Sequence, residues 1–259
     1  MIATGLVLAV PAAGRCDQGP DLEAAFIASF GHASPLTRTL TVPIHDGPDA
    51  PKRVGTGSVS FGVRPNRLVD LGDHEVALVS YEVNEIVAHA APGAIAISYL
   101  GRTSGGWVPR HLWPELLTSG VGGQPANAGA ELHRFAGDPL FFARSARCGM
   151  GECSEWIGVI RMSSAGPVAY DDILAGAASP TGETKALMKM NHDCESYALK
   201  ARIEPPRRLG SLFSVRYDGW TAPPGTLFPK KPLHLVTDFV PDGTRLVMQP
   251  AVPVPTCGR

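Results

Sequence analysis

Three short segments place a histidine directly beside an acidic residue, and they are the first places where this chain could do chemistry. They are His45-Asp46, Asp73-His74-Glu75 and His192-Asp193. An imidazole beside a carboxylate is the pair used in acid–base catalysis and in many metal sites. However, neighbouring residues on a strand point to opposite faces, so adjacency alone does not make a working pair. All three segments also lie at predicted turns, so we expect no metal ion and no cofactor there.

The sequence contains no complete catalytic or nucleotide-binding signature. The nearest match to a serine nucleophile turn is Ser58-Val59-Ser60-Phe61-Gly62, in which Ser58 stands where the pattern requires glycine. The patterns of zinc proteases, EF-hand calcium sites, phosphate-binding loops and dinucleotide-binding turns are also missing. We therefore favour a binding protein without catalytic activity.

A second interpretation keeps the histidines as catalytic groups of an extracytoplasmic hydrolase. Its acid–base residues would come from the His-Asp and Asp-His-Glu turns. Geometry separates the two interpretations, because a hydrolase needs imidazoles and carboxylates together in one cleft. The histidines that decide this are His74, His89, His111 and His192.

Aromatic and polar residues before a glycine-rich stretch are the candidate binding residues. The stretch runs from Ser119 to Ala130 and reads SGVGGQPANAGA. Long glycine-rich loops carry function more often than strands do, and exposed aromatic rings can stack on a ligand or anchor a partner. We expect a pocket edged by Trp107 or Trp113 beside this loop, and place Trp156 in the core. The candidate binding residues are Trp107, Arg110, His111, Trp113 and Gln124.

The N-terminus has the layout of a secretory signal peptide. Residues Ile2 to Val10 are apolar except for Thr4, and small residues follow them, although no Lys or Arg precedes the apolar run. We expect residues 1–14 to be a signal peptide, with cleavage between Ala12 and Cys16, and a periplasmic or secreted protein. Arg15 stands where a lipidation site needs a small residue, and no later segment is apolar for long enough to cross a membrane.

The net charge of the chain counts against two classes of partner, nucleic acids and anionic membrane surfaces. The formal net charge is −1, and the basic residues are scattered apart from the pairs Arg207-Arg208 and Lys230-Lys231. A chain of this kind has no overall attraction to nucleic acid or to an anionic membrane surface. The expected partner is therefore another protein or a component of the cell envelope.

The five cysteines fit an oxidising compartment. Cys148 and Cys153 bracket a tight turn, CGMGEC, whose spacing is too wide for a zinc or redox motif. If the two face each other across a hairpin, they form a disulfide. The sequence leaves the pairing of Cys16, Cys194 and Cys257 open.

This hairpin belongs to the segment from Asp138 to Leu174, which predicts three short strands joined by tight turns. Facing cysteines place Phe142 opposite Val159 and Phe141 opposite Ile160, which are favourable aromatic–aliphatic pairs. Because side chains alternate between faces, the phenylalanines make both faces apolar at that end. We therefore expect the phenylalanine end to be buried and the cysteine end to lie near water.

The remaining chain predicts one helix and many strands. Asp21 is a good N-cap for a helix at about 21–30, and Gly31 is a good stop. Arg110 to Leu117 (RHLWPELL) predicts a short helical turn. About a dozen β-type runs, with frequent glycine and proline between them, indicate an all-β fold. We expect residues 15–259 to form a single β-rich domain, an antiparallel sandwich, barrel or small propeller-like meander with one N-terminal amphipathic helix. The sequence shows no clean repeat, which counts against the propeller.

Overall fold

A computed structural model describes residues 19–31, 36–45, 54–84, 93–119, 130–135, 137–149, 152–178, 196–223 and 228–250. Within these ranges the chain forms one helix and thirteen strands, which confirms the all-β prediction. The helix and the first sheet comprise α1 (Leu22–Phe30), β1 (Leu36–His45), β2 (Val54–Gly72), β3 (Glu75–Asn84), β4 (Gly93–Thr103) and β5 (Gly106–Ser119). The second sheet comprises β6 (Glu131–His133), β7 (Leu140–Gly149), β8 (Glu152–Ser163), β9 (Gly166–Ala178), β10 (Ser196–Glu204), β11 (Phe213–Ala222), β12 (Lys231–Asp242) and β13 (Arg245–Gln249).

Both sheets are antiparallel meanders. Strands β1 to β5 form a five-stranded sheet and β6 to β13 an eight-stranded sheet, and each strand pairs with its neighbour in the sequence. Among the described strands neither sheet closes on itself through hydrogen bonds, so β1, β5, β6 and β13 are edges. The packing is therefore that of a sandwich rather than of a closed barrel.

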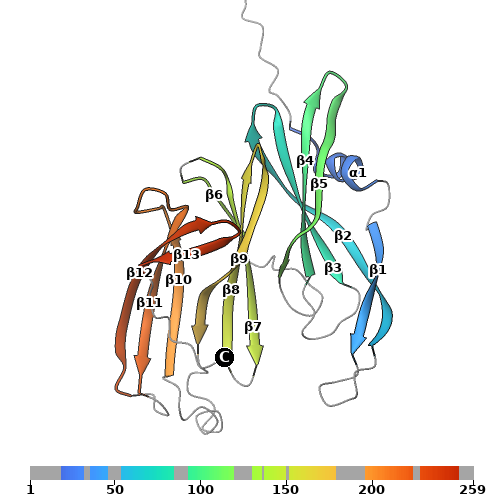
Figure 1. The fold of residues 1–259 in the computed structure, drawn as a ribbon. Helices are drawn as coiled ribbons and strands as arrows, with labels where there is room; N and C mark the ends of the chain where they lie inside the picture. The colour runs from blue at the N-terminus through green and yellow to red at the C-terminus, as the bar shows by residue number, and fades with distance from the viewer. Residues whose placement is uncertain are drawn as a thin grey trace, which may run out of the picture.

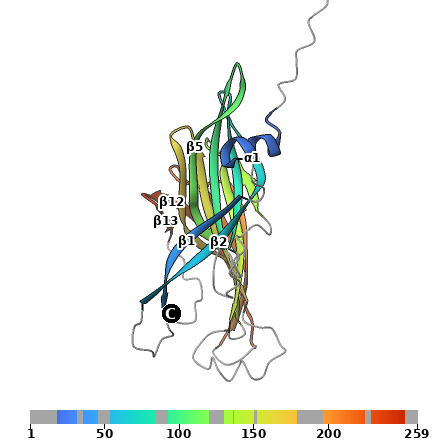
Figure 2. The same cartoon turned by 90° about the vertical axis from the view of Figure 1, so that its right-hand side faces the viewer.

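The helix α1 forms where its local sequence predicts it. The Asp21 carboxylate accepts hydrogen bonds from the backbone N–H groups of Glu23 (2.7 Å) and Ala24 (3.4 Å), and Gly31 ends the helix at φ +88°. The helix lies on the outer face of the first sheet (Figures 1 and 2). Its buried side chains and those of the sheet form the helix-side core, which consists of Ala25, Phe26, Val63, Val76, Leu78 and Leu100.

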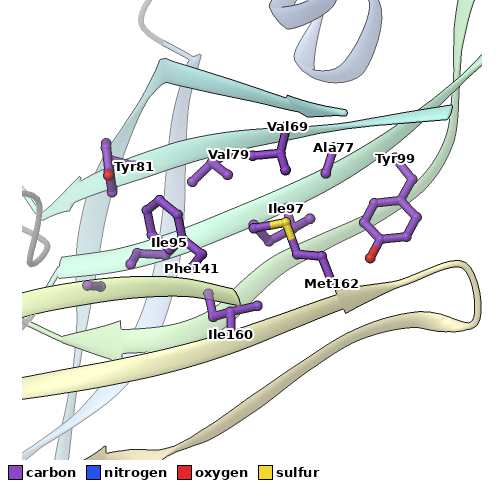
Figure 3. Close-up of a cluster of buried hydrophobic side chains, with 11 residues drawn as sticks. Val69, Ala77, Val79, Tyr81, Ile95, Ile97, Tyr99, Phe141, Ile160 and Met162 are labelled. Carbon is purple, nitrogen blue, oxygen red and sulfur yellow. The ribbon is translucent and has the colours of Figure 1, made fainter. Parts of the chain in front are cut away.

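The opposite face of the first sheet packs against β7 and β8. Side chains from β2, β3 and β4 meet Phe141 and Ile160 in what we call the inter-sheet core, shown in Figure 3. Outside this core, Arg134 donates a hydrogen bond to the backbone carbonyl of Asp70 and joins the two sheets again. The inter-sheet core consists of Val69, Ala77, Val79, Tyr81, Ile95, Ile97, Tyr99, Phe141, Ala143, Ile160 and Met162.

The second sheet folds over itself and makes a further core. Its strands β9 and β10 pair only where Ala198–Lys200 meet Gly176–Ala178, and beyond that point β10 to β13 pack across the face of β6 to β9. Figure 1 shows β12 and β13 bending back toward β9. The second core consists of Leu140, Phe142, Ile157, Val159, Tyr170, Ile173, Ala201, Phe213, Val215, Tyr217 and Phe239. The strands β6 to β9 thus form a middle layer, in which β7 and β8 contribute buried side chains to a core on each face.

The structure confirms the predicted register of the central hairpin. Phe142 is opposite Val159, Phe141 is opposite Ile160, and Cys148 is opposite Cys153 along the backbones of β7 and β8. Phe141 and Phe142 are fully buried, as predicted from their apolar surroundings on both faces. The cysteine side chains lie outside what the structure describes, so the disulfide stays a prediction.

The helical turn predicted at Arg110 to Leu117 is wrong, because this segment is part of the edge strand β5. Its backbone pairs with β4 on one side, and an edge strand tolerates proline on its unpaired side. Local sequence favoured a turn, but the hydrogen bonds available from β4 decided the conformation. No helix in the described part of the chain is long and apolar enough to cross a membrane.

Candidate functional site

A charged depression lies at one end of the first sheet, beside the turns that join β2 to β3 and β4 to β5. Both turns are at the top of Figure 1. Its volume is about 420 Å³. We call it the turn-end depression. Its lining residues are Asp73, His74, Glu75, Gly101, Arg102, Arg110 and His111.

The turn between β2 and β3 presents two of these side chains through an unusual backbone. Asp73 (φ +46°) and His74 (φ +62°) both adopt the left-handed conformation, which glycine and asparagine adopt more easily. The carbonyl of His74 accepts a hydrogen bond from the backbone N–H of Arg102 at 3.0 Å, which ties the turn to β4. Non-glycine residues in this conformation are concentrated at functional sites. The turn therefore holds an acidic and an imidazole side chain at the sheet end at some cost in stability.

A bulge in β5 supplies the next side chain. Tyr99 pairs with His111 and Leu100 pairs with Pro109, so Arg110 is the extra residue of the bulge. The guanidinium of Arg110 lies directly against the backbone of Gly101, where an added Cβ would collide with it. Gly101 is therefore needed for the close approach of Arg110 to β4.

Two tryptophans stand behind the lining residues. The guanidinium carbon of Arg102 lies 6.0 Å from the centre of the Trp107 ring, at the limit of a cation–π contact. The rings of His111 and Trp113 lie 5.7 Å apart, and Trp113 in turn packs edge-on against Tyr99 at 4.9 Å. Burial raises the pKa of Tyr99, so this phenol stays neutral and serves as packing. Each tryptophan thus limits the movement of one lining side chain.

The candidate binding residues are only partly brought together. Arg110 and His111 line the depression. Trp107 packs on the helix-side core and Trp113 on the inter-sheet core, so they lie on opposite faces of the sheet and form no single exposed patch. Gln124, with most of the glycine-rich stretch, lies outside the described residues.

In the sequence the turn residues and Arg110 are separate features. Asp73, His74 and Glu75 stood out as a possible chemical motif, whereas Gly101 and Arg102 did not. The sequence does contain a signal that these residues converge, since in a meander every second turn lies at the same end of the sheet. Two turns with charged residues, separated by one complete hairpin, therefore come together.

His74 and His111 share the depression with Asp73 and Glu75, which meets the geometric condition for a hydrolase. His89 and His192 lie outside the described residues. In the described part of the chain, however, neither imidazole of the depression hydrogen-bonds to a carboxylate, and Asp73, His74 and His111 are exposed to water. A catalytic base needs an orienting partner, as a catalytic triad shows.

The charges of the depression favour binding over proton transfer. Two arginines and two carboxylates line one open surface, where they can pair with the charged groups of a partner. Across the described residues, no three His, Cys, Asp or Glu side chains are placed to hold a metal ion. The arrangement thus suits recognition of a polar surface that carries both signs of charge.

Comparisons with known proteins add no assignment. The chain matches no family model, no curated protein and no solved structure. The depression and the neighbouring strand β5 are therefore the features from which a function can be inferred.

Proposed function

We propose that this chain is an exported, non-catalytic binding protein that contacts another protein of the cell envelope through the turn-end depression and β5. The observation that carries the proposal is a run of five exposed residues on this edge strand, from Val108 to Leu112. Val108 is 38% exposed and Leu112 is 43% exposed, with Arg110 between them. Arginine beside exposed apolar side chains is a common composition of protein interfaces.

The edge of β5 is suited to side-chain contact rather than to the addition of a further strand. Pro109 and Pro114 lack a backbone N–H group, and the bulge at Arg110 interrupts the strand. A partner would therefore pair its charged groups with those of the depression and place an apolar group on Leu112, because the pairing of Val108 with Gly101 and of Leu112 with Ser98 puts Val108 on the other face of the sheet. The contacts of Arg102 with Trp107 and of His111 with Trp113 reduce the entropy lost on binding.

Export and a periplasmic or secreted location are supported by the apolar N-terminal segment and by the cysteine content. The near-neutral charge supports a partner other than nucleic acid. An envelope component other than a protein is the next candidate, since hydroxyl and charged groups also suit the depression. The second class of function is hydrolysis, which the convergence of His74 and His111 with two carboxylates favours.

Site-specific photocrosslinking in the native host tests the proposal. A photoreactive residue at Leu112 should give a covalent adduct with an envelope protein. The same residue at Val247, which is 42% exposed on the distant edge strand β13, should not give it. The adduct should be lost in R110E, and also in G101A, because an added Cβ displaces Arg110. The variant R64Q, with an exposed arginine of β2 outside the depression, should keep it.

Equal adducts from both positions, or an adduct at Leu112 that R110E leaves intact, would refute the proposed interface. An assay with chromogenic esters tests the alternative function, hydrolysis. Hydrolysis by the purified protein that disappears in H111A would replace the binding function with the catalytic one.

A further inference from the structure

A smaller pocket lies at the end of the second core, between the middle layer and the strands that fold over it. Its volume is about 210 Å³. We call it the Arg161 pocket. Its walls are Phe135, Gly137, Asp138, Leu140, Arg161, Ser211 and Leu212. None of these residues lines the turn-end depression, so a ligand here is independent of the function proposed above.

Two polar atoms of this pocket have no hydrogen-bond partner within the described part of the chain. They are Nε of Arg161 and Oγ of Ser211, and both atoms are buried. They come from different parts of the second sheet, since Arg161 is on β8 and Ser211 precedes β11. Leaving a buried donor unpaired costs about 1–3 kcal/mol, so the pocket favours an occupant with an acceptor oxygen.

A carboxylate is the acceptor that this pair of donors fits best. A guanidinium binds a carboxylate through two parallel N–H donors, and a serine hydroxyl can donate to the same group. The apolar part of the occupant is also defined, because Leu140, Leu212 and Phe135 belong to the second core or pack against it. The pocket therefore offers polar donors next to an apolar wall.

The negative charge of Asp138 indicates which charges a ligand of this pocket should carry. Its Oδ2 lies 3.7 Å from Nε of Arg161, which is an ion pair but too long for a hydrogen bond. A simple carboxylate would add a second negative charge beside one arginine. A molecule that also carries an ammonium group would pair with Asp138 and leave no charge without a partner.

We propose that the Arg161 pocket binds a small α-amino acid with an apolar side chain. Its carboxylate would lie at Arg161 and Ser211, its ammonium group at Asp138, and its side chain against Leu140 and Leu212. The volume is sufficient, since an engineered cavity of about 150 Å³ holds a benzene molecule.

The walls of the pocket are preformed. The backbone N–H of Leu212 donates to the carbonyl of Phe239 at 2.9 Å, and that of Ser211 donates to Arg208 at 3.3 Å. On the other side, the N–H of Met162 donates to the carbonyl of Pro139 at 2.9 Å. A site fixed in this way loses little conformational entropy on binding.

Titration of the purified protein with three related ligands tests the charge pattern. L-leucine carries both groups, 4-methylpentanoate carries only the carboxylate, and 3-methylbutylamine carries only the ammonium. Methyl resonances of Leu140 and Leu212 should shift with L-leucine, and the two single-charge analogues should bind at least about tenfold more weakly. No shift with L-leucine at millimolar concentration would show that the pocket holds water alone and would overturn the proposal.

Variants separate recognition from a purely structural effect. S211A should weaken L-leucine binding, and R161Q should abolish it, while R202Q, with an exposed arginine of β10 outside the pocket, should not change it. D138N should weaken L-leucine by about tenfold or more but strengthen 4-methylpentanoate, because a repulsive charge is removed. If D138N changes both affinities in the same direction, Asp138 does not select an ammonium group and the assignment of an amino acid is wrong.

Discussion

At the scale of single residues, His74 has a backbone conformation that disfavours any side chain, yet it places an imidazole at the turn-end depression. Its φ of +62° favours glycine, because a Cβ costs roughly 1–2 kcal/mol in this conformation. We predict that H74G raises the free energy of unfolding by about 1 kcal/mol and weakens the crosslink from Leu112. H74A, which keeps the Cβ, should weaken the crosslink without the gain in stability. Urea denaturation of the wild-type protein, H74G and H74A measures the free energies of unfolding. A destabilised H74G would show that the imidazole serves folding instead.

Asp238 is a buried carboxylate whose ionisation is linked to stability. Its Oδ1 accepts hydrogen bonds from Ser214 Oγ at 2.6 Å and from the backbone N–H of Arg207 at 2.9 Å, and its side chain is 6% exposed. Burial raises the pKa of Asp238, but these hydrogen bonds and the charge of Arg208, 3.6 Å away, outweigh burial and lower the pKa below its usual value. The charged form is thus the stabilising one.

A lowered pKa in the folded state fixes the direction of the pH effect. The stabilisation is complete above the pKa of an unfolded aspartate, about 3.9, and is lost as the pH falls through the lower folded-state pKa. We predict that D238N lowers the free energy of unfolding by about 2 kcal/mol at neutral pH. Below about pH 4 the difference in this free energy between D238N and the wild-type protein should shrink. The exposed D242N is the matched control for chemical denaturation at several pH values. A constant difference at all pH values would contradict the prediction.

At the scale of elements, the sequence predicted those whose conformation is decided locally. The helix α1 has its cap, its stop and its apolar face within one short segment, and all three are as predicted. The β7–β8 register followed from one tight turn, whose bracketing residues Cys148 and Cys153 are five positions apart. In contrast, β5 was predicted in part as a helical turn, because its conformation depends on β4 and on a bulge that no local pattern marks.

The candidate site, too, was predictable only where neighbouring residues in the sequence carry the signal. Arg110 and His111 were singled out from their neighbours in sequence, and they line the depression. Their convergence with Asp73 and Glu75 depends on the pairing of β3 with β4 and of β4 with β5, which brings together residues as far apart in the sequence as Glu75 and Arg110, 35 positions. The left-handed backbone of Asp73 and His74 is also invisible in the sequence, since neither residue is a glycine.

At the scale of the whole molecule, β7 and β8 connect two cores that share no residue. Phe141 contributes to the inter-sheet core and Phe142, its neighbour, to the second core, because strand side chains alternate between faces. The molecule is therefore a stack of α1, the first sheet, the middle layer, and the strands β10 to β13. A middle layer of this kind must be apolar on both faces, which explains the double phenylalanine.

This arrangement predicts that neighbouring substitutions loosen different layers. F141L and F142L should each lower the free energy of unfolding by about 1–2 kcal/mol, because both rings are fully buried. In hydrogen exchange, F141L should speed the amides of β3 and β4, whereas F142L should speed those of β11 and β12. The costs should be nearly additive in the double variant, since the two rings have no core partner in common. If both variants speed the same amides, the two cores open together, and the middle layer is one cooperative unit with the layers on its two faces.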